Sequence, residues 1–149
     1  MFLTDINTEL GEKTRTVLAK EFGENNVGFG EQDVTKQEEW REVWEKAEKF
    51  FGGRVEVLCN NAGIFHKTEW KRTLDINLMG VAYGTMLAME KMGVSKGGQG
   101  GLIIQTGSMA SFLAGFDTIE ESAYTAAKQG VLGYCRSVAT PQLYKRWVY

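Results

Sequence analysis

Short apolar segments that end in polar residues alternate with helical segments along the chain, and this alternation restricts the possible folds more than any other feature. Strand-like segments are expected at residues 1–5, 27–32, 55–59 and 102–106, and the strand at 55–59 is expected to be buried. A helix is predicted from a cap at Asn7 or Thr8 to Gly23, and a second from a capping box at Thr35–Glu38 to Gly52. Two more are predicted from Glu69 to Met92 and from Ser122 towards Pro141. Such alternation favours βαβ units, so the predicted fold class is α/β, a doubly wound parallel sheet with helices on both faces.

Polar residues stand where the expected strands end. Asp5, Asp33, Asn60 and Ser108 each follow an apolar segment. Ligands of open parallel sheets bind beyond the carboxyl ends of the strands. The sequence therefore predicts that these four residues contribute to one site, although each of them taken alone is equally compatible with an ordinary turn.

The last helix opens with Tyr124 and Lys128, which are four residues apart and project from one helical face. An ammonium held beside a phenol favours the phenolate, which can serve as a general base near neutral pH. The spacing is also common among unrelated surface residues. The pair becomes informative only together with the rest of the chain.

Composition excludes several classes of function. The chain has 149 residues and a net charge of −2, without the basic patch expected of a protein that binds nucleic acid or an anionic membrane. Cys59 and Cys135 are far apart and lack metal-ligand spacing, so two buried free thiols and no metal are expected. With neither a long apolar run nor a signal peptide visible, the prediction is a cytoplasmic protein.

Apolar stripes predict which helical faces are buried. The first helix is expected to bury a stripe formed by Leu10, Val17, Leu18 and Phe22. The second helix is expected to bury Trp40, Trp44, Ala47 and Phe51, a stripe more compatible with core packing than with the stacking of nucleic-acid bases. Four methionines on the third helix are assigned to core or subunit packing: Met79, Met86, Met89 and Met92. Asn77 is a poor helix former inside that helix, and such local misfits often mark sites.

Taken together, these motifs resemble the short-chain dehydrogenase/reductase family over about residues 1–139. The resemblance is carried by Tyr124-x-x-x-Lys128, Asn60-Asn61-Ala62-Gly63, Asp33-Val34 after a strand, Asn77 between Ile76 and Leu78, and a serine after Leu102-Ile103-Ile104. It implies a Rossmann-type domain and an NAD-dependent enzyme that interconverts a secondary alcohol and a ketone. Hydroxy fatty acids and prostaglandin-like alcohols are the implied substrates.

The resemblance also implies residue roles. Catalytic roles fall on Ser108, Tyr124, Lys128 and Asn77: Ser108 would orient the substrate oxygen, Tyr124 would take the hydroxyl proton, and Asn77 would hold a water that relays it outward. Lys128 would favour the phenolate and hold the nicotinamide ribose. The remaining cofactor contacts would come from Asp5 and Ile6 at the adenosine ribose, Asp33 and Val34 at the adenine, and Asn60, Asn61 and Ala62 in the middle.

Three departures from the family pattern qualify these expectations. The glycine-rich turn T-G-x-x-x-G-x-G is absent, so the first strand and helix are expected to precede Met1. Ser108 lies sixteen residues before Tyr124, whereas Ser111 has the usual spacing of thirteen. Ser108 is nevertheless preferred, because it follows the strand directly and the extra residues fit a loop over 116–121, and Ser111 remains an alternative. Beyond Ala139 the resemblance ends.

The sequence is therefore expected to be an incomplete domain, either a piece of a longer protein or the product of a truncated gene model or splice form. The parent protein is expected to be a homodimer with a small-molecule substrate. The alternative is an inactive fragment that acts at most as a dimerisation module.

Overall fold

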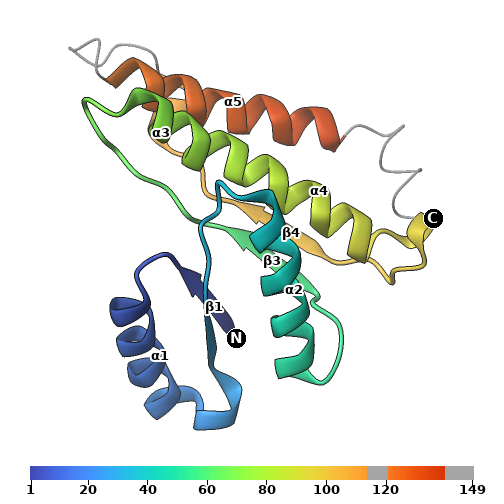
Figure 1. Cartoon of the computed structure of the whole chain (residues 1–149). Helices are drawn as coiled ribbons and strands as arrows, with labels where there is room; N and C mark the ends of the chain where they lie inside the picture. Colours follow the sequence, from blue (N-terminus) through green and yellow to red (C-terminus); the bar gives the residue numbers. More distant parts are fainter. Residues whose placement is uncertain (114–120, 140–149) are drawn as a thin grey trace. The chain divides into compact units, whose positions relative to one another are not determined.

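The computed structural model describes residues 1–113 and 121–139 and divides the chain into two compact units, Met1–Val55 and Glu56–Tyr149. Each unit has its own two-stranded parallel sheet, and Figure 1 colours the elements in chain order. The parallel pairing predicted from the alternation of strands and helices is therefore confirmed in both units. The predicted loop over 116–121 lies outside the described residues except for Glu121, and the helix stop predicted at Pro141 lies outside them as well.

The first unit contains two strands that alternate with two helices. Its elements are β1 (Phe2–Asp5), α1 (Thr8–Phe22), the 3₁₀ turn η1 (Glu24–Asn26), β2 (Gly28–Glu31) and α2 (Gln37–Phe51). Asn7 is the N-cap of α1, because its side-chain oxygen accepts a hydrogen bond from the backbone N–H of Leu10 at 2.9 Å. Gly23 follows the last residue of α1. Both ends of α1 are thus where the sequence predicts them.

The apolar stripe predicted to bury α1 is wrong at three of its four residues, and the fourth, Leu18, is half-buried. Leu10, Val17 and Phe22 are all more than half exposed, and the buried residues of this helix are Gly11 and Ala19. A methyl group at Gly11 would lie 2.1 Å from Cε2 of Phe29 on β2, so the aromatic ring occupies the space of a side chain there. The helix therefore packs through small residues, which a count of large apolar residues does not detect.

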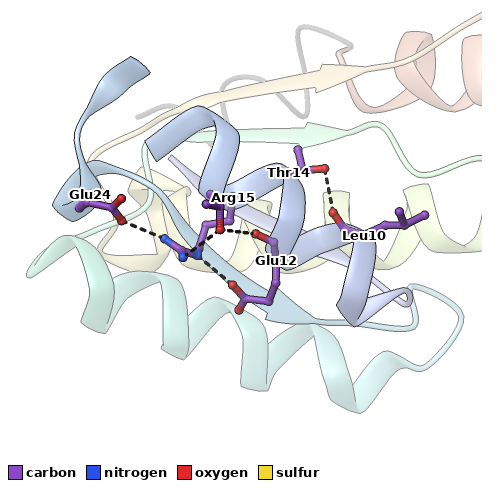
Figure 2. A network of polar contacts seen from close by, with 6 residues as sticks. Leu10, Glu12, Thr14, Arg15 and Glu24 are labelled. Atoms are coloured by element: carbon purple, nitrogen blue, oxygen red, sulfur yellow. Dashed lines mark hydrogen bonds and ion pairs between the residues drawn. The ribbon is translucent and has the colours of Figure 1, made fainter. Parts of the chain in front are cut away.

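The exposed side of α1 carries a polar network around Arg15. Its guanidinium donates to Glu12 at 2.8 Å and to Glu24 at 3.3 Å, and Thr14 donates from its hydroxyl to the backbone oxygen of Leu10 (Figure 2). The hydrogen bonds to Glu12 and Glu24 raise the pKa of Arg15 above its ordinary value. Exposed pairs of this kind contribute little to stability, so we assign this network to the solvated surface.

The stripe predicted for α2 is confirmed except at its end. Trp40, Trp44 and Ala47 are buried, whereas Phe51 is 44 % exposed. The predicted capping box that starts at Thr35 is not formed; the N-cap is Lys36, without a side-chain cap. Glu39, one residue beyond the Glu38 of the predicted capping box, instead accepts a hydrogen bond from the backbone N–H of Asp33, which precedes the helix.

The second unit holds a long helical segment beside a second long helix. Its elements are β3 (Val57–Asn60), α3 (Trp70–Leu74), the π-helical segment η2 (Asp75–Gly80), α4 (Val81–Met92), the 3₁₀ turn η3 (Val94–Lys96), β4 (Leu102–Gln105), the 3₁₀ turn η4 (Met109–Ser111) and α5 (Ser122–Val138). Helix α3, η2 and α4 follow one another without a break, and α5 runs along α3 and η2 (Figure 1). Helix α4 packs against β3 and β4.

One face of the β3–β4 sheet is exposed, contrary to the prediction of a fully buried strand at 55–59. Val57 pairs with Leu102, Cys59 pairs with Ile104, and all four side chains are exposed. Alternate residues of a strand point to opposite faces, so these four share one face. The thiols of Cys59 and Cys135 are free, as predicted, but neither is fully buried.

The methionines of the long helical segment divide between core and surface. Met92 is buried, whereas Met79 and Met86 are 42 % and 58 % exposed. These two lie seven residues apart, which places them on one side of the helix. None of the helices in the described part of the chain is long and apolar enough to cross a membrane.

Candidate active site

The predicted pair Tyr124 and Lys128 comes together near the start of α5. The Nζ atom of Lys128 lies 5.8 Å from the centre of the Tyr124 ring. Lys128 is only 5 % exposed, and its ammonium donates to the backbone oxygen of Thr106 at 2.8 Å. A buried charge needs such partners to remain in place. The loop after β4 therefore holds the ammonium beside the phenol.

The two candidate serines are linked but differ in surroundings. Ser111 is buried, and its hydroxyl donates to the backbone oxygen of Lys128 at 2.9 Å while accepting from the N–H of Ser108 at 3.2 Å. Ser108 is half-buried, and its Oγ accepts from the N–H of Ala110 at 3.2 Å. The Ser111 hydroxyl thus ties η4 to α5, whereas the hydroxyl proton of Ser108 remains available to a ligand as far as the described residues show.

Asn77 is fully buried in η2, and its side chain bonds to the chain after β3. Its Oδ1 accepts from the N–H of Ile64 at 2.8 Å, and its Nδ2 donates to the oxygen of Ile64 at 2.6 Å. A methyl group at Gly63 would lie 2.9 Å from that Oδ1 and 3.7 Å from Nζ of Lys128. Only a residue without a side chain permits so close an approach. Gly63, Asn77 and Lys128 are consequently neighbours.

Asn60 ends β3 in a buried polar network. Its Nδ2 donates to Oε1 of Gln105 at 2.9 Å and to Oγ1 of Thr85 at 3.1 Å, and Gln105 also donates to Thr85 at 2.7 Å. The Oδ1 of Asn60 is buried and has no hydrogen-bond partner among the described residues. Asn61 accepts from the hydroxyl of Thr106 at 2.8 Å, and Ala62 is exposed. The turn therefore retains one open buried acceptor.

The predicted adenosine-binding residues lie in the first unit. Asp5 is exposed at the end of β1, with Oδ1 accepting from the N–H of Asn7 at 2.8 Å, and Ile6 beside it is 55 % exposed. Asp33 follows β2, and its Oδ1 accepts from both the N–H and the hydroxyl of Thr35 at 3.0 and 2.7 Å. The backbone oxygen of Val34 accepts from Nε1 of Trp40 at 3.0 Å.

A carboxylate supports the Asp33 turn from α2. Glu39 accepts from the N–H of Asp33 at 2.6 Å and from Nζ of Lys36 at 2.8 Å. The ammonium of Lys36, followed by that backbone N–H, lowers the pKa of Glu39, and the same pairing raises the pKa of Lys36. This arrangement replaces the capping box that the sequence predicts at Thr35.

Sequence reasoning misses two contributors to the site. Phe65 packs edge-on against Tyr124, with ring centres 5.3 Å apart and an interplanar angle of 85°. The backbone oxygen of Thr106 holds Lys128. A backbone atom leaves no signal in the residue type, and an aromatic residue in a polar loop has no periodicity that would single it out. Within residues 1–113 and 121–139, no group of acidic, histidine or cysteine side chains could hold a metal ion.

Comparison with known proteins identifies the family of this chain. The family model for short chain dehydrogenases matches residues 1–147. The chain is 36 % identical over 137 residues to mouse 15-hydroxyprostaglandin dehydrogenase [NAD(+)], covering 92 % of this chain and 49 % of the mouse protein. It is 35 % identical over 145 residues to trans-4-hydroxycyclohexanecarboxylate dehydrogenase of Sinomonas cyclohexanicum, covering 92 % and 53 %.

Solved structures also resemble the chain. The crystal structure of a short chain dehydrogenase from Mycobacterium smegmatis superposes with a TM-score of 0.80 at 29 % identity, covering 93 % of this chain and 58 % of that one. The chain belongs to the short-chain dehydrogenase family and has its Rossmann-like α/β fold with parallel strands. It spans about half the length of the curated relatives it matches.

The residues present fit part of a dinucleotide. The Oδ1 of Asn60 is a buried acceptor without a partner among the described residues, and the missing side chain at Gly63 permits a flat ligand to approach near Lys128. Asp5 presents an exposed carboxylate of the kind that binds ribose hydroxyls. A glycine-rich turn that would receive a pyrophosphate is not found in the sequence.

Proposed function

We propose that this chain carries the catalytic centre of an NAD-dependent dehydrogenase that interconverts a secondary alcohol and a ketone. The observation that carries the proposal is the arrangement of Tyr124, with the ammonium of Lys128 5.8 Å from its ring and Ser108 on the adjoining η4. A cation at that distance attracts the ring of Tyr124 electrostatically. Membership of the dehydrogenase family supports the same reaction class.

Each protein group would have a distinct task. Tyr124 accepts the hydroxyl proton of the alcohol on its phenol oxygen. Ser108 donates its free hydroxyl proton to the substrate oxygen, while Ser111 keeps η4 against α5 through the backbone oxygen of Lys128. A bound NAD would supply the acceptor for the hydride that the substrate carbon loses when the alcohol becomes a ketone. Asn77 holds the backbone of Ile64 in place and, as the resemblance implies, would also retain a water on the path by which the proton leaves.

The same proposal assigns the cofactor contacts. Lys128 and Tyr124 would hold the nicotinamide ribose, and Asn60, Asn61 and Ala62 the middle of the cofactor. Asp5 and Ile6 would meet the adenosine ribose, and Asp33 and Val34 the adenine. A carboxylate at the ribose accepts hydrogen bonds from its hydroxyls and repels a 2′-phosphate, which supports NAD over NADP. The mouse relative is named as NAD-dependent.

Relatives suggest the substrate class. One is named for 15-hydroxyprostaglandin and another for a hydroxycyclohexane carboxylate. Both are secondary alcohols on an apolar skeleton. We propose such an alcohol here, with hydroxy fatty acids and prostaglandin-like compounds first in the order of testing.

The two free cysteines are consistent with a reducing compartment such as the cytoplasm.

A second candidate function is non-catalytic association. Met79 and Met86 form an exposed apolar strip on η2 and α4, and exposed apolar strips often mark protein contacts. A homodimer formed through these helices would suit either an active enzyme or an inactive pairing module. Sedimentation of the Met86→Glu variant tests this role, because the added charge would weaken association of the chains and leave the Tyr124 site unchanged.

The function is tested in a chimera that supplies the segments by which the curated relatives exceed this chain. The missing parts of the mouse relative would be fused before Met1 and after Ala139, and NADH formation would be followed by absorbance with a panel of secondary alcohols. Oxidation that requires NAD and disappears in the Lys128→Met variant is the expected result. A chimera that binds NAD but oxidises none of the alcohols would overturn the proposed reaction.

A further inference from the structure

Phe65 stands between two anchored residues in the loop that leads from β3 to α3. On one side, both backbone polar groups of Ile64 are bonded to the buried side chain of Asn77. On the other side, Nδ1 of His66 accepts from the N–H of Glu69 at 3.2 Å, and the His66 backbone oxygen accepts from the hydroxyl of Thr73 in a long bond of 3.5 Å. The backbone on either side of Phe65 is therefore held.

The anchoring groups are themselves fixed in the fold. Asn77 and Thr73 are both fully buried, and both lie on the helical segment formed by α3 and η2. That segment packs along α5, which carries Tyr124. The loop and the tyrosine are thus attached to the same pair of packed helices. A side chain on this short loop has little freedom to move relative to the Tyr124 ring.

Phe65 is half exposed and nevertheless makes a defined contact. Its ring meets that of Tyr124 edge to face at 5.3 Å, while the ammonium of Lys128 lies 5.8 Å from the centre of the same tyrosine ring. Edge-to-face packing is a preferred geometry, because the positive edge of one ring meets the negative face of another. Single exposed apolar side chains are common on protein surfaces, so the inference rests on this ring contact and not on the exposure of Phe65.

We propose that Phe65 is a positioning residue for Tyr124, held in place by the clamp that Asn77, Thr73 and His66 form on residues 64–66. The inference rests on the proposed role of Tyr124 as the proton acceptor. Phe65, together with α5, sets the plane of the Tyr124 ring and thereby the direction of its phenol oxygen. Loss of the ring contact is expected to lower turnover about tenfold, the upper range for one aromatic pair.

The first test uses the 149-residue chain itself and needs no activity. The five tyrosines would be labelled with 3-fluorotyrosine, and the Tyr124→Phe spectrum would assign its fluorine resonance. Phe65→Leu removes the ring and keeps an apolar side chain, so the Tyr124 resonance should move and broaden. Phe65→Tyr keeps the ring and should restore it. Trp70→Leu, which removes another exposed ring five residues further on, is the matched control and should leave that resonance in place.

The second test separates the clamp from the ring. His66→Asn retains a side-chain acceptor for the N–H of Glu69, whereas His66→Ala removes it. Only His66→Ala should move the Tyr124 resonance in the direction seen for Phe65→Leu. In the chimera, Phe65→Leu should lower kcat about tenfold with little change in KM for NAD, and Phe65→Tyr should recover it.

The outcomes distinguish this inference from the proposed function. An unmoved Tyr124 resonance in Phe65→Leu overturns the positioning role, whatever the chimera does. A moved resonance in a chimera without dehydrogenase activity supports the ring contact and refutes the proposed function instead. Equal loss of turnover in Phe65→Leu and Phe65→Tyr also overturns the role, because the aromatic ring would then not be the feature that matters.

Discussion

The side-chain amide of Asn77 bonds to both backbone polar groups of Ile64, accepting from the N–H at 2.8 Å and donating to the oxygen at 2.6 Å. An asparagine that disfavours the α-helix is thereby accommodated in the π-helical segment η2 and joins it to the loop after β3. The local misfit is compensated by two hydrogen bonds that no residue close in sequence supplies. This relationship links the stability of the second unit to the geometry of its candidate site.

Asn77→Ala should destabilise the chain by about 2–4 kcal/mol, because the N–H and the oxygen of Ile64 would lose their partners inside the fold. Urea unfolding followed by circular dichroism measures the loss. Asn61→Ala is the matched control: Asn61 is exposed and accepts one hydrogen bond, from Thr106, so its change should stay below about 1 kcal/mol. Equal losses at the two positions would contradict the structural role assigned to Asn77.

Tyr124→Phe should remove nearly all turnover in the chimera while leaving the affinity for NAD nearly unchanged. Loss of one general base costs about 10²–10⁴-fold in rate. Steady-state kinetics with a calorimetric NAD titration checks both halves of this statement. Tyr134→Phe is the control, since Tyr134 lies on the same helix and its hydroxyl has no partner among the described residues. Turnover of Tyr124→Phe within a few-fold of the parent would refute the catalytic assignment.

Tyr134 provides a prediction about alkaline pH. Burial raises the pKa of its phenol above the ordinary value of 10.0. Since the folded pKa is the higher one, stability is fully present below pH 10 and is lost as the pH rises through the folded value. Tyr134→Phe should flatten the fall in melting temperature above pH 10, because the titrating group is removed. A parallel fall in parent and variant would show that Tyr134 does not contribute.

Glu39 provides the corresponding prediction for acid. Lys36 first, and then the N–H of Asp33, lower the pKa of this carboxyl below its ordinary value of 4.5. A lowered folded pKa means that the stabilisation is present above pH 4.5 and is lost as the pH falls through the folded value. Glu39→Gln should weaken this dependence, and a carbon-detected carboxyl titration would measure the pKa directly. A pKa of 4.5 or higher in the folded chain would contradict the pairing.

The chain by itself should bind NAD weakly and show no dehydrogenase activity. It has no glycine-rich turn whose backbone N–H groups would receive the pyrophosphate, and the strands described pair only two by two, which leaves strand edges open to association. Calorimetric titration with NAD, combined with light scattering, tests both expectations. Micromolar binding by a monodisperse monomer would show that the residues present suffice.

Asp5 determines the expected choice of cofactor. Asp5→Ala in the chimera should weaken NAD binding and reduce its advantage over NADP, since the carboxylate is expected to accept hydrogen bonds from the ribose hydroxyls and to repel a 2′-phosphate. Ratios of kcat/KM for the two cofactors measure the effect. A parent chimera that already favours NADP would refute this role for Asp5.

Much of this protein follows from its sequence alone. The alternation of strands and helices predicts parallel pairing, and Asn7 and Gly23 mark the ends of α1, because caps and periodicity are local properties of the chain. Tyr124 and Lys128 share a face because they are one helical turn apart. The family assignment rests on the same short motifs, and the family model confirms it.

Only the tertiary structure decides the burial of α1, the use of the two serines and the surroundings of Tyr124. Gly11 is buried because Phe29, eighteen residues away, fills its space, whereas Leu10 and Val17 remain exposed. The Ser111 hydroxyl donates to the backbone oxygen of Lys128, whereas the Ser108 hydroxyl donates to no acceptor among the described residues. These outcomes depend on contacts between residues that are far apart in the sequence. Such contacts form only when the helices and strands pack together, so local sequence patterns do not reveal them.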